Sequence, residues 1–290
     1  MITYNPKTWF QFIFTFHKND SFRTLLPSLI ALIAITSVLV FIEVNYFNIQ
    51  IKNITFFHQV IGFILSMLLV FRINTAYDRW WEGRKAWGSL LNNSRNLSIK
   101  IDAFLPKEMK KERKLLLLLI SNYPFVLKEH LRDNFIAEEI QFNNSFTQEE
   151  LAKAIHKPNY VAKRITDELS KLQKNGELQI EHLLLLNEEL RSFTDVSGIC
   201  ERIKSTPIPY SYSLYLKRII FLYVITMPVV FAIDFKYWAI LFVALIFYSF
   251  ATLELISEEI EDPFGKDDND LPTDDIAAKI KLNVEEILLS

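Results

Sequence analysis

The sequence predicts an all-α protein that is embedded in a membrane. Half of its 290 residues are hydrophobic and 14% are aromatic, and the few Gly and Pro residues exclude a disordered chain. The formal net charge is only -2, but four long stretches contain no charged side chain at all. No alternation of apolar and polar residues with the period of a strand persists for long.

The four uncharged stretches are the expected membrane helices, and they cover residues 24–42, 53–71, 219–233 and 237–253. A bilayer core about 30 Å thick requires roughly 20 helical residues, so the first two stretches are long enough and the last two are short. Snorkelling basic side chains and an aromatic interface could supply the missing length. The alternative is a set of buried helices in a soluble α domain. A cleaved signal peptide does not fit, because the first apolar run begins beyond residue 20 and has no small-residue cleavage site.

Basic residues beside the spans predict their orientation. Lys and Arg gather before the first span, after the second and before the third, whereas the loops within each pair of spans carry one basic residue each. Because positive charge stays on the cytoplasmic side, both termini and residues 72–218 are expected in the cytoplasm. The sequence therefore predicts a multi-pass protein of the cell (inner) membrane.

Residues 72–218 are expected to form a cytosolic helical region. Amphipathic patterns cover residues 107–131 and 149–172, with Pro106, Pro158 and the turn before Gly176 as boundaries. The tail, residues 254–290, is acidic and ends in a short amphipathic helix from about residue 276 to 289. Because no linker or repeat interrupts the chain, we expect a single domain over residues 1–290.

No pattern in the sequence indicates an enzyme. The histidines lack metal-binding spacing, and there is no Gly-rich phosphate loop, HExxH or GxSxG motif. The single cysteine, Cys200, cannot form an internal disulfide and is expected to be a small buried hydrophobe. No catalytic residue and no nucleic-acid partner are expected.

Three segments carry unusual patterns: Phe71–Gly88 (FRINTAYDRWWEGRKAWG), Cys200–Tyr212 (CERIKSTPIPYSY) and Glu258–Asp270 (EEIEDPFGKDDND). In the first, charged residues and Trp on a helix that leaves the membrane allow ion pairs and indole hydrogen bonds. In the second, two prolines favour an extended stretch before a membrane helix. In the third, crowded carboxylates suit a hard cation such as Ca²⁺, and a solvated acidic loop is the alternative.

Together and in this order, the three segments resemble the bestrophin family of ion channels, particularly its bacterial members. The resemblance implies a helical bundle with four membrane helices per subunit and a pentameric ring around a central pore lined by the second helix. The expected function is an ion channel for small monovalent ions. Its partners would be copies of the same chain, membrane lipid and small inorganic ions.

The resemblance also assigns residues to the pore. A hydrophobic neck ends just before the motif residue Arg72, and steps of four residues back along the helix give Phe71, Met67 and Phe63. A second constriction, the cytosolic aperture, is expected near Ile180 to Leu183, with candidates Ile180, His182 and Leu183.

Calcium and ion selectivity follow from the acidic segment. Asp267, Asp268, Asn269 and Asp270 match the calcium clasp of animal members, but Lys266 stands where the animal pattern is acidic, so Ca²⁺ is the one cofactor considered. Acidic residues near the cytosolic end and the association of bacterial members with cations predict cation conduction. The alternatives are an anion (chloride) channel of the same fold and a non-conducting membrane scaffold or sensor.

Overall fold

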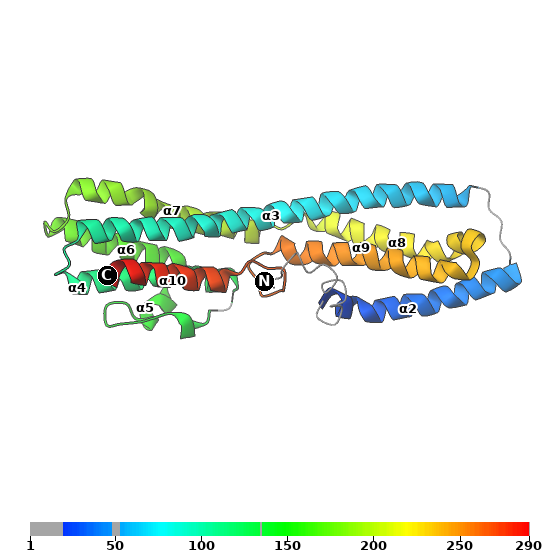
Figure 1. The fold of residues 1–290 in the computed structure, drawn as a ribbon, viewed down its shortest axis with the longest axis horizontal. Coiled ribbons are helices and arrows are strands. Elements are labelled where there is room, and N and C mark those ends of the chain that lie inside the picture. Colours follow the sequence, from blue (N-terminus) through cyan, green and yellow to red (C-terminus); the bar gives the residue numbers. More distant parts are fainter. Residues whose placement is uncertain (1–19, 48–52, 134, 290) are drawn as a thin grey trace. The chain divides into compact units, whose positions relative to one another are not determined.

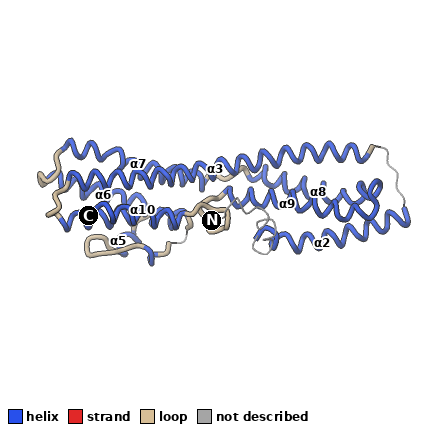
Figure 2. Tube along the Cα trace, viewed as in Figure 1, coloured by secondary structure: helices blue, strands red, loops and turns tan. Residues whose placement is uncertain are grey.

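The structure, a computed structural model, describes residues 20–47, 53–133 and 135–289. Its helices follow in the order α2 (Asp20–Ile42), η2 (Glu43–Phe47), α3 (Ile54–Phe104), α4 (Lys110–Leu131), η3 (Ala137–Glu139), α5 (Gln148–Lys153), α6 (Lys157–Lys174), α7 (Ile180–Ser205), α8 (Tyr210–Phe235), η4 (Lys236–Trp238), α9 (Ala239–Glu261) and α10 (Thr273–Leu289) (Figure 1). Within the described ranges, strand pairing is limited to an isolated bridge between Asn143 and Phe146 (Figure 2). The all-α prediction is confirmed.

The chain divides into two compact units, each built from separate segments. The first unit contains residues 1–79, 207–262 and 267–269, and the second contains residues 80–206, 263–266 and 270–290. Helix α3 contributes residues to both units. The expectation of a single domain stays a prediction.

Three helical segments of the described chain are long and apolar enough to cross a membrane: Ser21–Phe47, Ile54–Phe104 and Tyr210–Glu261. The last combines α8 and α9, which η4 joins. The two short predicted spans therefore extend beyond their uncharged cores. Helix α8, with 26 residues, is about 39 Å long because each residue rises 1.5 Å. Lys217 and Arg218 lie inside this helix, about two turns after its start, and Asp234 is its last residue but one, so a search for uncharged residues underestimated the length of the helix.

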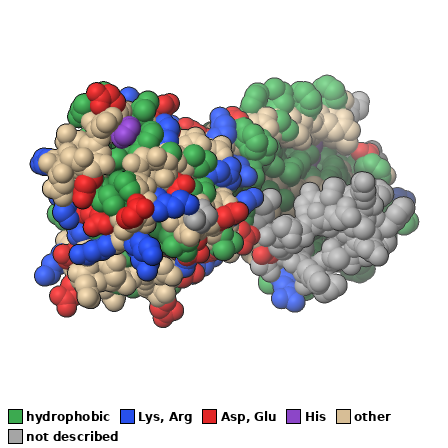
Figure 3. Space-filling model, turned by 60° about the vertical axis from the view of Figure 1, so that its left-hand side comes forward, with side chains coloured by type: hydrophobic (Ala, Val, Ile, Leu, Met, Phe, Trp, Pro, Cys, Tyr) green, Lys and Arg blue, Asp and Glu red, His purple; other side chains and the backbone are tan. Residues whose placement is uncertain are grey.

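The surfaces of the two units differ in composition. On the face drawn in Figure 3, charged side chains are spread over the second unit, whereas the described surface of the first unit is largely hydrophobic. Large exposed apolar residues of the first unit occur on each of its long helices, for example Ile30, Phe63 and Phe221. A lone soluble protein seldom exposes so much apolar area, so this surface fits a lipid environment and helix neighbours.

The first unit is held by packing of α2, α8 and α9 and by a small core that includes α3. Leu65 and Leu69 of α3 are fully buried against Met227 of α8 and Val243 of α9. Nearby, the His58 ring stacks on Tyr223 at 4.1 Å. A Cβ atom added at Gly62 would lie 2.3 Å from the Tyr223 hydroxyl oxygen, so the absent side chain of Gly62 allows this close approach.

The second unit has a larger core that centres on α4. Trp87, Tyr123 and Phe193 are buried there, and the Tyr123 hydroxyl donates a hydrogen bond to the Phe193 carbonyl oxygen at 2.5 Å. Helix α6 buries Ile165 and Leu169 together with its other apolar residues at helical spacing, and this confirms its amphipathic pattern.

The amphipathic stretch over residues 149–172 forms two helices, α5 and α6, which divide next to the boundary residue Pro158. His156 adopts an extended conformation, and its Nδ1 accepts a hydrogen bond from the Asn159 backbone N–H at 3.2 Å. Pro158 in the first turn of α6 has no N–H to donate to a preceding turn. A capped start with Pro in the first turn therefore begins a new helix inside the amphipathic stretch.

An ion network joins α10 to α4 within the second unit. Arg132 donates to the Asp274 carboxylate at 2.7 and 3.0 Å, and Lys128 donates to it at 2.7 Å. The hydrogen bonds from Arg132, followed by those from Lys128, hold the pKa of Asp274 well below its usual range. This carboxylate contributes stability above its unfolded pKa of about 3.9, and that contribution is lost as the pH falls through the lower folded value.

We predict that Gly62→Ala destabilises the protein by about 1 to 3 kcal/mol, because the new methyl group must displace a stacked aromatic ring from a packed core. The measurement is the apparent melting temperature of the detergent-solubilised protein. Gly198→Ala is the matched control, since Gly198 also lies in a helix but has no atom within 4 Å of the added Cβ. Equal melting temperatures for the two variants would contradict this prediction, because they would mean that displacing the Tyr223 ring does not lower the stability of the fold.

Candidate functional site

The three motif segments meet at the Glu261 carboxylate in the first unit. Arg72 of the first segment forms an ion pair with it, with Nη2 and Oε2 2.7 Å apart. Ile208 of the second segment donates its backbone N–H to Oε1 at 2.6 Å. Arg79 donates from Nε to the Glu261 carbonyl oxygen at 3.0 Å. The sequence identified the segments, and the fold brings them into contact.

Arg72 is the most deeply buried charge of this cluster. Only 1% of its surface is exposed, and its second acidic neighbour, Glu254, lies with Oε2 3.7 Å from Nε. A buried charge is tolerated when partners compensate for its lost hydration, so the two carboxylates of α9 are needed to keep the guanidinium inside. Because Arg72 directly follows Phe71, the ion pairs also fix the rotation of α3 at that position.

In the second unit the motif residues again contact each other. Glu82 and Arg202 form an ion pair. Phe264 is 1% exposed and packs over Gly83, where an added Cβ would lie 3.1 Å from its ring. The Phe264 carbonyl oxygen accepts a hydrogen bond from Arg132 Nε at 3.2 Å. The signature residues thus stabilise local packing in both units.

The residues predicted for the neck lie together on one exposed face of α3. Phe63, Met67 and Phe71 are 68%, 48% and 56% exposed, whereas Leu65 and Leu69 on the opposite face are buried. Residues four apart on an α-helix keep nearly the same direction, so these side chains form one apolar stripe. Their role as a neck stays a prediction.

The aperture candidates do not share one direction. Ile180, the first residue of α7, is 52% exposed. The His182 ring instead stacks on Phe104 at 4.3 Å, and Leu183 packs against the core of the second unit. Two apolar residues that follow, Leu184 at 70% and Leu185 at 54%, are also exposed.

The calcium candidates are held in different surroundings. In the first unit, Asn269 donates from Nδ2 to Glu259 Oε2 at 2.5 Å. In the second unit, Asp270 is 2% exposed. Among the described residues, Asp267, Asp268 and Asp270 do not form a group whose carboxylate oxygens lie within 4.8 Å of one another. Calcium binding stays a prediction.

Sequence reasoning missed one group of potential ligands. His130, His156 and Glu201 have ligand atoms within 4.8 Å of one another, although the three residues are far apart in the chain. Burial, followed by the charge of His156, lowers the pKa of His130 below its ordinary value. Spacing could not reveal this group, because metal motifs are recognised in sequence when at least two ligands share one local element.

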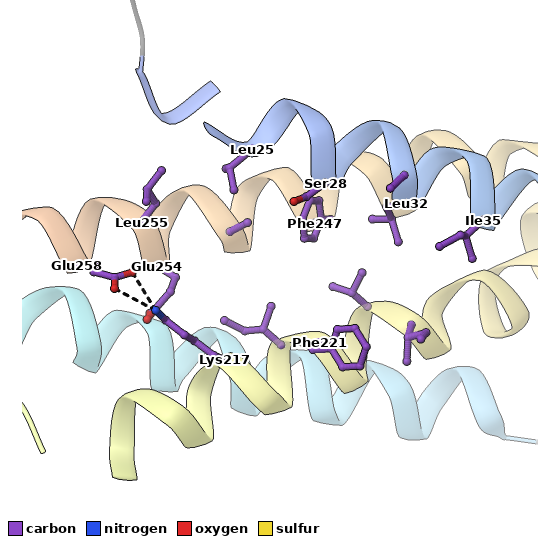
Figure 4. Close-up of a pocket in the computed structure, with 15 residues that line it drawn as sticks. Leu25, Ser28, Leu32, Ile35, Lys217, Phe221, Phe247, Glu254, Leu255 and Glu258 are labelled. Atoms are coloured by element: carbon purple, nitrogen blue, oxygen red, sulfur yellow. Dashed lines mark hydrogen bonds and ion pairs between the residues drawn. The ribbon is translucent and has the colours of Figure 1, made fainter. Parts of the chain in front are cut away.

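A cavity of about 540 Å³ lies between α2, α8 and α9 in the first unit. Most of its lining is apolar, including Leu32, Phe221 and Phe247, and the Lys217 ammonium lies 2.9 Å from a Glu258 carboxylate oxygen at one end (Figure 4). The cavity is therefore apolar along most of its lining and has the Lys217–Glu258 ion pair at one end.

Comparison with known proteins identifies the family. The family model described as bacterial and fungal bestrophin protein matches residues 1–286. The chain belongs to the bestrophin family. This bestrophin is 31% identical over 292 residues to the voltage-dependent anion channel-forming protein YneE of Escherichia coli K12, covering 98% of this chain and 93% of YneE. It is 38% identical over 228 residues to the voltage-dependent anion channel-forming protein alr2987 of Nostoc, with coverages of 77% and 74%.

Solved structures agree with this assignment at the level of the fold. A bacterial bestrophin homologue from Klebsiella pneumoniae has a TM-score of 0.83 at 23% identity, covering 92% of this chain and 99% of that one. The resemblance predicted from the motifs is therefore confirmed. The bestrophin is a membrane protein with the helical fold of bacterial members, and its relatives indicate a channel and not an enzyme.

We predict that Arg72→Met destabilises the bestrophin by about 3 to 5 kcal/mol, because the buried Glu254 and the mostly buried Glu261 would lose their cation. Thermal unfolding in detergent measures the effect. Arg191→Met is the control: it removes an exposed ion pair with Asp195, whose side chains are 77% and 57% exposed, and should cost less than about 1 kcal/mol. Similar losses in both variants would contradict a special role for the buried pair.

Proposed function

We propose that this bestrophin is a homopentameric anion channel of the bacterial cell membrane, with both termini in the cytoplasm. The observation that carries the proposal is the similarity, over 98% of the chain, to a relative named as anion channel-forming. The exposed apolar stripe of α3 supplies a surface on which a pore can be built. Conduction distinguishes this function from a scaffold or sensor, which would carry no ion flux.

The names of the relatives favour the anion alternative over cation conduction, for which the comparisons give no support. The structure also weakens the electrostatic reason for expecting cations. Glu254 and Glu261 surround Arg72, and Glu258 pairs with Lys217. Carboxylates that are neutralised by adjacent cations cannot form the negative ring that attracts cations.

A ring of five copies would use the apolar face of α3. A single protomer leaves this face exposed, and a closed symmetric ring is the usual way for identical subunits to bury equivalent surfaces. Turned toward the axis, Phe63, Met67 and Phe71 would make three stacked apolar rings about 12 Å deep, since each step of four residues rises about 6 Å. Such a neck offers water no hydrogen-bond partners and can dewet.

For the cytosolic aperture, Ile180 is the better candidate of those that the sequence suggested. Its exposed side chain is available to a pore, whereas His182 and Leu183 are engaged inside the second unit. We include Leu184 with it, because its side chain is exposed within the same turn of α7.

Cation conduction is the second candidate function, because Asp78 is exposed seven residues after Phe71 on α3. Seven residues advance an α-helix by about 700°, so Asp78 returns to within roughly 20° of the neck stripe. Five such carboxylates near the axis would attract cations and repel anions. Substitution of Asp78 is thus a direct test between the two selectivities.

We predict that the reversal potential in a KCl gradient, measured with the purified protein in planar bilayers, lies near the chloride equilibrium value. Asp78→Asn should shift it little if chloride is the permeant ion. A wild-type value near the potassium equilibrium potential that Asp78→Asn moves toward chloride would establish the cation alternative. Absence of current in liposomes that contain correctly assembled protein would indicate a scaffold or sensor.

We also predict that replacing Phe63, Met67 and Phe71 together by Ala widens and wets the pore, giving larger currents and a higher open probability. The control is the triple variant Ile30→Ala, Ile35→Ala and Val38→Ala on α2, which removes exposed apolar side chains of another helix. Native mass spectrometry must give five protomers for each protein. If the assembled α3 variant conducts like the wild type, the neck is formed by other residues.

A further inference from the structure

Three helical elements of the second unit converge on one carboxylate. His130 lies near the end of α4, His156 caps the start of α6, and Glu201 lies in the last turns of α7. We propose that His130, His156 and Glu201 form a binding site for a zinc ion. The site is separate from the predicted calcium segment and from the residues assigned to the pore.

The distances are close to those that a zinc ion requires. Glu201 Oε1 lies 2.8 Å from His156 Nε2 and 3.3 Å from His130 Nε2, and the two imidazole rings are 4.7 Å apart between centroids. A tetrahedral ion with ligands at about 2.0 to 2.1 Å separates those ligands by roughly 3.3 Å. Shifts of some tenths of an ångström in side chains would therefore admit the ion.

The ligand chemistry favours zinc over calcium or magnesium. Imidazole nitrogen is a preferred ligand of Zn²⁺, and two His with one carboxylate is an established zinc ligand set, whereas hard cations choose oxygen. All three side chains are partly exposed, between 28% and 35%, so an ion can enter and water can take the fourth position. Glu201 supplies the negative charge that two neutral imidazoles do not.

A neighbouring hydrogen bond prepares the carboxylate. Ser197 lies one turn before Glu201 on α7, and its hydroxyl donates to Glu201 Oε1 at 2.7 Å. Groups behind the ligands that fix their orientation raise metal affinity. The nearby cation Lys204 forms an ion pair with Asp133, which reduces its repulsion of a metal.

His156 must rearrange for binding. Its Nδ1 accepts the Asn159 backbone N–H, so the neutral ring carries its proton on Nε2, the atom that faces Glu201. Zinc coordination by Nε2 moves this proton to Nδ1 and breaks the capping hydrogen bond, with no net release of a proton from the ring. The bound ion would then link α4, α6 and α7, and its bond to His156 would replace the local capping hydrogen bond at the start of α6.

The test is calorimetric titration of ZnCl₂ into the full-length, chelator-treated assembly after removal of any purification tag. We expect one zinc per chain, with affinity reduced about 100-fold or more in His130→Gln, His156→Asn and Glu201→Gln, because loss of a ligand exceeds the 10- to 100-fold effect of losing a supporting group. His156→Asn is the sharpest variant, since Asn retains a good helix cap while removing the imidazole. His182→Gln, which removes a histidine elsewhere in the unit, should leave zinc binding unchanged.

Cobalt provides a second readout. Titrated with CoCl₂, the wild type should develop the visible absorption of a four-coordinate ion with nitrogen and oxygen ligands, and folded His156→Asn should not. Calcium at millimolar concentration should not compete. Zinc binding below one ion per chain, or equal binding by the wild type and all three ligand variants with the cobalt band retained, would overturn the site.

Discussion

The buried guanidinium of Arg72 is the constraint on which the first unit depends. It is placed one residue after the apolar stripe of α3, and its charge is compensated by Glu254 and Glu261, both from α9. Glu261 also accepts the Ile208 N–H just before α8. Displacement of any of these segments would leave a charge or an N–H buried without a partner, which costs far more than the loss of a few apolar contacts. The direction of Phe63, Met67 and Phe71 therefore follows from an ion pair beyond the stripe.

The same pairing changes how the acidic residues should be interpreted. Counted in the sequence, carboxylates at the end of α9 suggest a negative ring, but the structure matches Glu254 and Glu261 with Arg72, and Glu258 with Lys217. A charge paired at short distance contributes little field beyond its partner. Selectivity would then depend on the few charges on the exposed face of α3, of which Asp78 lies in line with the neck stripe.

The sequence predicted the helical class, the apolar centres of the membrane helices and the three motif segments, because hydrophobic runs and short motifs are local properties. It began the α8 span too late and ended it too early, since Lys217, Arg218 and Asp234 lie within the helix, and it ended the α9 span at residue 253 although the helix continues to Glu261. It could not show that His182 and Leu183 turn into a core while Ile180 stays exposed, because that depends on the rotation of α7 against its neighbours. The meeting of His130, His156 and Glu201 likewise depends on the packing of three helices.

The motifs that identify the family are therefore different from the residues that would touch an ion. Arg72, Glu82, Gly83, Glu261 and Phe264 are engaged in ion pairs or close packing within one unit, and such contacts tolerate few substitutes. The neck candidates are Phe and Met, which many apolar residues could replace without loss of a ring that dewets. A sequence can thus carry a strong signature of the fold and still leave selectivity open, because selectivity depends on exposed positions whose chemistry the fold does not dictate.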